Sequence, residues 1–399
     1  MGNKKKKEMI LFEKALEIVM SSVVKMGTEI LPLTESLNRI LAENVCSDID
    51  MPPFDKASMD GFACRREDIF NELEIVETIA AGQKPGKKLD KDQCARIMTG
   101  APIPEGADCV IIVEETGILP SGRLKFMGSY IRDNVAYRGE DFRRGETVLT
   151  GGRQIKPQDI AILASAGKVS VEVSKMPSVG VISSGDELVE PQFMPGESQI
   201  RNSNSWQIMA QIKRAGGAEK YYGIARDNES ETYKIISKAI SENDMVIITG
   251  GVSMGDFDFI PKVLKRAGVR LLFDRVAVKP GKPTTFGIHE NAIVFGLPGN
   301  PVSAFMIFEM LVRPFISAMM NYNWKPLHLL LPMKEDFSRR SSQRMALIPA
   351  KITDDNCISP VDYHGSAHIT SLSEADGIFF VPAGVKKIEK GTAVTFNYI

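Results

Sequence analysis

The stretch MVIITGGVSMGDFDF, residues 245–259, decides the fold class of this chain. Residues 245–248 are apolar without alternation, which is typical of a strand that is buried on both faces of a sheet. Thr249, Gly250, Gly251 and Ser253 follow at once, and two aspartates come after them. A strand that ends in small and acidic residues predicts a ligand-binding loop at its carboxyl end.

The sequence around this stretch alternates apolar strands with amphipathic helices from residue 177 to about residue 326. VGVISSG, YYGIARD and IVFGLPG are predicted strands, and NSNSWQIMAQIKRAGG and ESETYKIISKAISEN are predicted helices. This alternation predicts an α/β domain in which helices cover both faces of a parallel sheet.

The remaining sequence predicts three further parts. Residues 1–49 and 146–176 predict one discontinuous helical domain, with two helices around TEILPLTES and a cap at Thr34 for the second helix. Short strands between glycines and prolines over 50–145 predict an inserted β-rich domain. Residues 327–399 again predict short strands, as a small C-terminal β-barrel or, alternatively, a sandwich. The fold class is therefore a multidomain α/β and β protein.

Composition narrows the class of function. The chain has 399 residues, 43% hydrophobic and 25% charged, which is the balance of a soluble globular protein of several domains. A formal net charge of −1 gives no reason to expect a nucleic-acid partner. Five scattered cysteines favour reduced thiols and a cytoplasmic location. The apolar segment 303–320 contains Glu309, Arg313 and Pro314, so we expect a core helix and no membrane partner.

Four predicted strand ends carry residues that suit an anion. They precede Gly185-Asp186-Glu187, Arg226-Asp227, the loop 249–259 and Pro298-Gly299-Asn300. Glycine-rich loops offer backbone N–H groups to phosphate, and Mg²⁺ joins carboxylates to phosphate oxygens. Lys279 and Lys282 lie on a stiff KPGKP turn, where two cations are best explained by a nearby anion. A single aspartate in such a loop is often only a helix cap, and Asp256 or Asp258 fits that interpretation as well.

Two proline-stiffened stretches in the inserted part place polar side chains beside glycines. PPFDKASMDGFA places Asp60 before a glycine, and MTGAPIPEGAD does the same for Thr99. Loops of fixed conformation often position functional groups, although surface turns look similar. In YRGEDFRRGE, Arg138 and Asp141 are predicted to form an exposed ion pair.

The ordered set PPFDKASMDGFA, RIMTGAPIPEGADCVI, RGEDFRRGE, ISSGDEL, TGGVSMGDFDF, VKPGKPTTFG and GLPGNPVSAF resembles the molybdopterin molybdenumtransferase family, the MoeA and gephyrin E-domain proteins. The resemblance runs from about residue 8 to the end of the chain. It implies four domains, an elongated homodimer, and an α/β domain that binds molybdopterin. It also implies a Mg²⁺-dependent transferase reaction, in which adenylyl-molybdopterin and molybdate give molybdenum cofactor and AMP. The implied active site is a cleft between the α/β domain of one subunit and the inserted region of its partner.

The resemblance and the loops together give the predicted site. The catalytic residues are Asp60, Thr99, Asp141 and Glu187, and the metal ligands are Asp227, Asp256 and Asp258. The substrate-binding residues are Arg138, Asp186, Thr249, Gly250, Gly251, Ser253, Lys279, Lys282, Pro298, Asn300 and Ser371. The family often has a tyrosine where this chain has Phe62, so one hydroxyl is missing.

Two other functions stay open from the sequence. A paralogue that inserts tungstate fits the same residues, because the two oxyanions have nearly the same size and charge. A scaffold of the gephyrin E-domain type is the non-enzymatic alternative, and the intact acidic and lysine motifs argue against it. The adenylyltransferase of the same pathway is a further possible partner.

Overall fold

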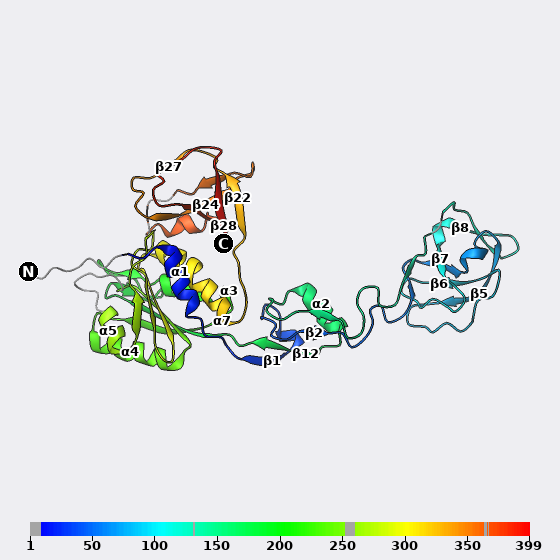
Figure 1. Cartoon of the computed structure of the whole chain (residues 1–399), viewed down its shortest axis with the longest axis horizontal. Helices are drawn as coiled ribbons and strands as arrows, with labels where there is room; N and C mark the ends of the chain where they lie inside the picture. Colours follow the sequence, from blue (N-terminus) through cyan, green and yellow to red (C-terminus); the bar gives the residue numbers. More distant parts are fainter. Residues whose placement is uncertain (1–8, 131, 252–259, 363–364, 366) are drawn as a thin grey trace, which may run out of the picture.

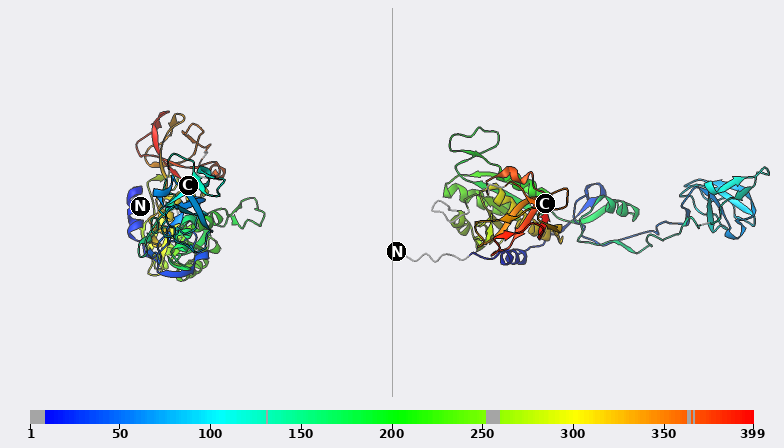
Figure 2. Two further views of the ribbon diagram at one scale, coloured as in Figure 1. Left: turned by 90° about the vertical axis from the view of Figure 1, so that its right-hand side faces the viewer. Right: turned by 90° about the horizontal axis from the view of Figure 1, so that it is seen from above.

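A computed structural model describes residues 9–130, 132–251, 260–362, 365 and 367–399 of the chain. Three six-stranded sheets mark three bodies of an elongated molecule, and a segment of two-stranded pairs lies between two of these bodies (Figure 1). The body that holds β4–β9 stands apart from the others in the view from above as well (Figure 2). The domain boundaries at residues 49, 146, 176 and 326 stay predictions.

The α/β body is built on a sheet with the strand order β16-β13-β17-β21-β20-β18. The first four of these strands run parallel, and β20 runs antiparallel to both of its neighbours, β21 and β18. The sheet is therefore mixed, which corrects the wholly parallel sheet that the sequence predicts. Residues 289–292 are too few for a crossover between parallel neighbours, so β20 and β21 pair as antiparallel strands. The strands are β13 (Ser178–Ser184), β16 (Ala218–Ala225), β17 (Met245–Thr249), β18 (Arg270–Phe273), β20 (Thr285–Ile288) and β21 (Ile293–Leu297).

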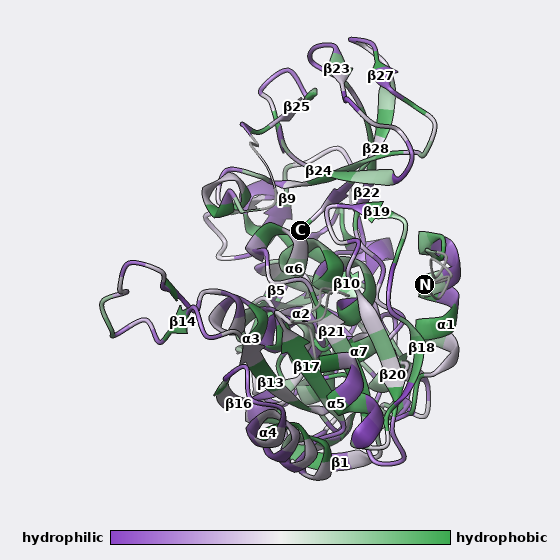
Figure 3. Cartoon of the chain, turned by 90° about the vertical axis from the view of Figure 1, so that its left-hand side faces the viewer, coloured by the Kyte–Doolittle hydropathy of each residue, from purple (hydrophilic) through white to green (hydrophobic). Residues whose placement is uncertain are grey.

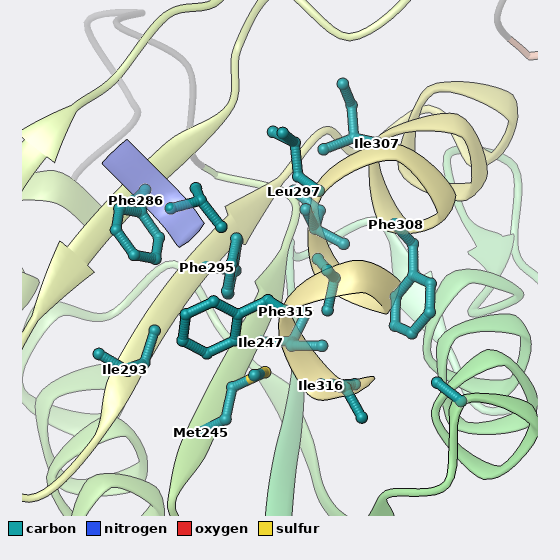
Figure 4. Close-up of a cluster of buried hydrophobic side chains, with 14 of the residues drawn as sticks. Met245, Ile247, Phe286, Ile293, Phe295, Leu297, Ile307, Phe308, Phe315 and Ile316 are labelled. Carbon is teal, nitrogen blue, oxygen red and sulfur yellow. The ribbon is translucent and has the colours of Figure 1, made fainter. Parts of the chain in front are cut away.

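Helices cover both faces of this sheet, and one apolar cluster lies on each face. Met245 and Ile247 join the cluster that packs against α3, α6 and α7, and Figure 4 shows part of it. Val246 and Ile248 join the cluster under α4 and α5. The strand is thus buried on both sides, as its unbroken apolar run predicts. The helices are α3 (Asn204–Ala215), α4 (Glu229–Glu242), α5 (Ile260–Arg266), α6 (Pro301–Ile307), the π-helix η4 (Phe308–Val312) and α7 (Arg313–Met319).

One helical stretch in the described part of the chain, Pro301–Met319, is long and apolar enough to cross a membrane. Of this stretch, 72% is buried inside the protein. The burial is that of a core helix, as the charged residues within the segment predict.

The segment between the α/β body and the separate body holds β1 (Thr28–Pro32), β2 (Val45–Cys46), β11 (Thr147–Leu149), α2 (Pro157–Ser165) and β12 (Ser170–Ser174). The first helix, α1 (Phe12–Ser21), leaves this segment and packs on the α/β body.

The prediction of a second helix after TEILPLTES is wrong. Only a 3₁₀ turn, η1 (Leu33–Glu35), forms there. The N–H groups of Asn38, Leu41 and Ala42 bond instead to the carbonyls of Ile155, Arg153 and Glu172. The connecting segment before α2 and the strand β12 therefore satisfy the backbone N–H groups that a helix would have satisfied within itself.

The separate body is the inserted β-rich part. Its sheet has the order β7-β4-β6-β5-β9-β8, and β4 is buried along its whole length. The strands are β4 (Gly61–Cys64), β5 (Glu72–Ile79), β6 (Gln93–Ile97), β7 (Cys109–Ile112), β8 (Thr116–Ile118) and β9 (Leu124–Phe126), with the pair β3 (Lys56–Ala57) and β10 (Val135–Ala136) and the 3₁₀ turns η2 (Arg66–Asp68) and η3 (Val113–Glu115).

The C-terminal sheet has the order β19-β24-β26-β28-β22, with β25 paired to β24. Its pairing does not join β19 to β22 within the described residues, so the sheet is open where the sequence predicts a closed barrel. Its edge strand β19 (Val278–Lys279) comes from the α/β part of the chain, so the KPGKP turn lies between the two bodies. The other elements are β22 (His328–Pro332), β23 (Phe337–Ser338), β24 (Met345–Ile352), β25 (Ile358–Pro360), η5 (Ile369–Leu372), β26 (Gly377–Val381), β27 (Lys387–Ile388) and β28 (Ala393–Tyr398).

Candidate functional site

The predicted strand-end loops meet at the carboxyl edge of the α/β sheet. Thr249, at the end of β17, is in register with Ser183 of β13 and with Leu297 of β21. The loops that follow these three strands therefore start side by side. Beyond the same edge, β14 (Leu188–Val189) and β15 (Ile200–Arg201) form the base of a loop that projects from the body (Figure 3).

Thr249 fixes the loops to one another through its hydroxyl. Its Oγ1 donates to the carbonyl of Pro298 at 3.0 Å and accepts from Nδ2 of Asn204 at 2.9 Å. The same Nδ2 donates to the carbonyl of Gly299 at 2.8 Å. Since the hydroxyl proton already has an acceptor, the structure gives Thr249 a positioning role, and direct substrate binding by this residue stays a prediction.

Gly250 lies where the backbone has a positive φ and no room for a side chain. Its φ is +85°, and a Cβ at this position would lie 2.4 Å from the carbonyl oxygen of Ser184. The backbone of β17 therefore turns away tightly against β13. This close approach explains why the apolar strand ends in glycine at this point.

A cavity of about 1140 Å³ lies between this edge and the C-terminal sheet. Its wall includes five of the predicted residues: Glu187, Lys279, Lys282, Pro298 and Asn300. Arg339, Arg340 and Arg344 come from the opposite, C-terminal side. Among the described residues, the lining carries five basic side chains and one carboxylate, so this part of the cavity wall is positive and suits an anionic ligand.

The sequence reasoning missed the three arginines. They lie in RRSSQR, residues 339–344, which contains no acidic residue and joins β23 to β24. A cluster of basic residues without acidic neighbours is a usable signal. It does not say which part of the molecule the cluster faces, because the C-terminal sheet must fold against the α/β body first.

A tight turn presents the two lysines to this cavity. Gly281 has a φ of +110°, and a Cβ there would lie 2.5 Å from Cδ1 of Ile307. The hydroxyl of Thr284 donates to the carbonyl of Gly281 at 2.6 Å and closes the turn. Within the described residues neither lysine forms an ion pair, so both charges are available to a ligand.

A smaller cavity of about 390 Å³ continues along the strand ends. Glu187, Thr249, Gly250 and Asn300 are among its lining residues. Ser184 also lines it, and its buried hydroxyl has no hydrogen-bond partner in the described part of the structure. A buried polar group without a partner is costly, so Ser184 marks a position where a ligand's polar atom would be stabilising.

Hydrogen bonds behind this smaller cavity fix its polar wall. Ser183 donates to Oδ1 of Asn202 at 2.8 Å, and Nδ2 of Asn202 donates to the hydroxyl of Tyr221 at 2.8 Å. The hydroxyl of Tyr221 donates to Oε1 of Glu190 at 2.6 Å. Burial and the bond to Glu190 raise the pKa of Tyr221, so it stays a neutral donor.

The acidic residues of the strand-end loops are only partly brought together. The N–H of Asp227 donates to Oδ1 of Asp186 at 3.0 Å, and Nη1 of Arg226 donates to the carbonyls of Asp186 and Leu188, both at 3.0 Å. No cluster of three His, Cys, Asp or Glu that could hold a metal occurs in the described ranges. Ser253, Asp256 and Asp258 lie outside those ranges, so their predicted roles stay predictions. Gly251, next to Gly250, is half-buried.

The predicted catalytic pair of the inserted part lies at the other end of the molecule. Asp60 precedes β4 and Thr99 follows β6, in the body that stands apart in Figure 1. Both N–H and Oγ1 of Thr99 donate to Oδ1 of Asp60, each at 2.7 Å. The backbone bond and then the hydroxyl bond from Thr99 hold the pKa of Asp60 below its usual value.

The predicted ion pair between Arg138 and Asp141 is wrong. Nε of Arg138 donates to Oδ2 of Asp50 at 2.6 Å, while the N–H of Asp141 donates to the carbonyl of Met51 at 3.0 Å. The bond from the N–H of Arg144, and then that from Arg138, lowers the pKa of Asp50. Asp50 is therefore a charged partner that the sequence reasoning missed.

Ser371 lies in η5 and is buried. Its hydroxyl donates to the carbonyl of His368 at 2.7 Å. Ile369, two residues away, lines the smaller cavity. Substrate binding by Ser371 stays a prediction.

Three family models match consecutive parts of the chain. The MoeA N-terminal region (domain I and II) matches residues 10–167, a probable molybdopterin binding domain matches 180–318, and the MoeA C-terminal region (domain IV) matches 329–399.

Curated relatives and a solved structure resemble the chain over nearly its whole length. It is 35% identical to the molybdopterin molybdenumtransferase of Staphylococcus epidermidis over 98% of this chain and 95% of that protein. It is 34% identical to that of Bacillus subtilis over 92% of this chain and 89% of that protein. A crystal structure of a molybdopterin biosynthesis MoeA protein from Pyrococcus horikoshii OT3 superimposes with a TM-score of 0.85 at 28% identity, covering 98% of this chain and 100% of that one.

Proposed function

The chain belongs to the MoeA family of molybdopterin molybdenumtransferases, and from this premise we propose that it inserts molybdenum into molybdopterin. In the proposed reaction, adenylyl-molybdopterin and molybdate give molybdenum cofactor and AMP. Both substrates are anions. The observation that carries the proposal is the cavity of about 1140 Å³, whose described lining has five basic side chains and one carboxylate.

The cavity supports this reaction because several negative charges must be held in one place. Adenylyl-molybdopterin carries a pyrophosphate linkage, and molybdate adds a second anion beside it. Lys279 and Lys282 lie on the α/β side and the arginines on the opposite side, so an anion between them meets cations from two directions. Fixed charges of this kind stabilise the negative charge that develops when a phosphate bond breaks.

The smaller cavity suits the neutral, hydrogen-bonding part of the substrate. We assign the pterin to it, because the match to a probable molybdopterin binding domain covers these strand ends. The unpartnered hydroxyl of Ser184 is then a donor for a polar atom of the pterin. Glu187, which lines both cavities, lies where the two parts of the substrate join.

Mg²⁺ fits the acidic side of this edge only together with the substrate. Asp186 and Asp227 are neighbours, but the described residues alone provide no complete metal site. Mg²⁺ commonly binds one or two carboxylates and completes its coordination with phosphate oxygens and water. Asp186, Asp227 and Glu187 are the residues we assign to it, with Asp256 and Asp258 predicted beside them. When bound, the ion would neutralise charge on the pyrophosphate.

Asp60 and Thr99 are distant from the cavity within one chain, so we propose that a second copy supplies them. In this homodimer the inserted body of one subunit lies over the cavity of its partner. Thr99 keeps Asp60 ionised and oriented by two hydrogen bonds. The carboxylate then orients a water or a molybdate oxygen against the phosphate linkage, and we propose that Asp141 and Arg138 of the same chain assist it.

We place this reaction in the cytoplasm. All five cysteines are free thiols, which is the usual state in a reducing compartment.

The direct experiment supplies purified protein with adenylyl-molybdopterin, molybdate and Mg²⁺. The proposal predicts release of AMP together with a cofactor that activates a cofactor-free molybdoenzyme. Absence of both products would overturn it. Tungstate in a parallel reaction tests the paralogue, which requires a higher kcat/KM for tungstate than for molybdate.

A further inference from the structure

Arg339, Arg340 and Arg344, in the loop between β23 and β24, differ in their hydrogen bonds. Arg339 is committed to the backbone. Its Nε donates to the carbonyl of Val385 at 2.7 Å, its Nη1 to that of Arg344 at 2.8 Å, and its Nη2 to that of Pro382 at 2.6 Å. Arg339 therefore holds the loop on the C-terminal sheet.

Arg344 ties the loop to the α/β side of the cavity. Its Nη1 donates to the carbonyl of Val278 at 2.9 Å, one residue before Lys279 in β19. The loop is closed further by the N–H of Gly384, which donates to the carbonyl of Ser342 at 2.7 Å. The backbone on both sides of Arg340 is thus fixed.

Arg340 differs from both of its neighbours. It is exposed, it lines the larger cavity, and its guanidinium has no hydrogen bond or ion pair in the described part of the chain. Lys279 and Lys282 line the same cavity and also lack ion pairs there. Holding three unpaired cations in one cavity is unfavourable in the free protein, and a bound anion would remove that repulsion.

We propose that Arg340 binds a tetrahedral oxyanion inside this cavity, opposite Lys279 and Lys282. The guanidinium is a planar fork that pairs with two oxygens of one anion, which an ammonium cannot do. Two sources supply such an anion: a phosphate group of the nucleotide part of the substrate, and molybdate. The identity of these anions rests on the proposed function, whereas the oxyanion chemistry rests on the cavity itself.

The competing explanation is that Arg340 is an ordinary surface arginine that solvent satisfies. Arginine side chains on protein surfaces often have no protein partner, and exposure alone does not separate the two cases. What favours a ligand is the difference within one short loop. Arg339 and Arg344 bond to backbone carbonyls. Arg340 lies between them in the sequence, at the wall of a cavity whose described lining already has an excess of positive charge.

The test compares Arg340→Gln, Arg340→Lys and the control Lys351→Gln. Lys351 is an exposed cation of β24 that does not line either cavity of the site, so its variant removes the same charge elsewhere. Titration calorimetry measures the binding of molybdate alone and of AMP alone to each full-length protein. Thermal melting should be unchanged in all variants, because Arg340 makes no contact that holds the fold.

We expect Arg340→Gln to weaken binding of one anion roughly ten-fold, the loss typical of one hydrogen bond to a charged group. Arg340→Lys should give a smaller loss, and Lys351→Gln none. A loss confined to AMP assigns Arg340 to the phosphate, and a loss confined to molybdate assigns it to the oxyanion substrate. Wild-type affinity of Arg340→Gln for both anions overturns the proposal, as does a wild-type protein that binds neither.

This readout does not depend on turnover, so its failure is distinguishable from failure of the proposed function. A protein that binds both anions through Arg340 but releases no AMP from adenylyl-molybdopterin keeps this inference and loses the reaction. In a turning-over enzyme, Arg340→Gln should raise KM for the matching substrate and leave kcat almost unchanged. A pure loss of kcat would contradict a binding role.

Discussion

The cavity beside β17 and the Asp60 region of the inserted body manage charge in opposite ways. In the cavity, five basic side chains face one carboxylate, and the two lysines have no acidic partner among the described residues. In the inserted part of the chain, the carboxylates of Asp50, Asp55 and Asp60 each accept a bond from a backbone N–H, at 2.9, 2.7 and 2.7 Å. The cavity therefore suits the binding of anions, whereas the Asp60 region keeps its own anionic side chains in fixed orientations.

This difference indicates that each region provides one part of an active site. Basic side chains bind a phosphate-bearing substrate but do not by themselves orient an attacking oxygen. Oriented carboxylates do that, yet they repel the same substrate unless cations hold it. The two regions lie at opposite ends of one molecule (Figure 1), and in the proposed homodimer the inserted body of one copy meets the cavity of the other.

The substitution with the largest expected effect removes the charge of Asp60. Asp60→Asn keeps the shape of the side chain, and we expect kcat to fall roughly 10²- to 10⁴-fold, the range for a positioned carboxylate. Affinity for AMP at the distant cavity should be unchanged, as calorimetry can measure. Wild-type rates of AMP release from this variant would remove Asp60 from the site.

The matching change in the cavity removes one unpaired cation. Lys282→Ala should weaken binding of the anionic substrates roughly 10- to 100-fold, since a hydrogen bond between charged groups is lost. Saturating substrate should restore part of the rate, which a KM and kcat comparison shows. A fall in kcat with unchanged affinity would mean that the two regions do not divide binding and orientation as described.

Thr99→Val sharpens the role of the inserted body. The variant loses the hydroxyl bond to Asp60 and keeps the bond from the backbone N–H. Because both bonds favour the ionised carboxylate, losing one raises the pKa of Asp60, and the acidic limb of the activity profile should move to higher pH. We expect roughly a ten-fold lower kcat at neutral pH. An acidic limb that does not move would show that Asp60 does not need to be ionised.

The sequence predicts many of the residues at the strand ends that line the cavity. It does not predict which residues of the C-terminal sheet pack opposite them. Apolar runs that end in Gly250 or before Gly299 predict one sheet edge, because parallel strands place their carboxyl ends together. RRSSQR is recognisable as a basic cluster but does not predict its place at the cavity, since its arginines reach the cavity only through the packing of the C-terminal sheet. The missing helix after residue 35 has a similar cause: distant carbonyls, such as that of Ile155, take up its N–H groups.

The smallest expected effect concerns the network that joins the strand ends. Thr249→Val keeps the volume but leaves the carbonyl of Pro298 without its donor. We expect a loss of about 1–3 kcal/mol in the free energy of unfolding, measured by urea denaturation. Ser178→Ala, which removes a hydroxyl bond to Asp244 at the opposite end of the same sheet, is the matched control. It should cost stability without changing substrate affinity, whereas Thr249→Val should change both.

A mixed dimer shows whether two copies of the chain share each site, as we propose. Asp60→Asn and Lys282→Ala chains carrying different tags are co-expressed, and dimers holding one chain of each are isolated through both tags. One site of such a dimer combines an intact cavity with an intact partner Asp60. At substrate concentrations below KM we therefore predict about half of the wild-type activity, although each parent dimer is nearly inactive under the same conditions. A mixed dimer as inactive as its parents would contradict the shared site and place Asp60 and Lys282 within one chain's reaction.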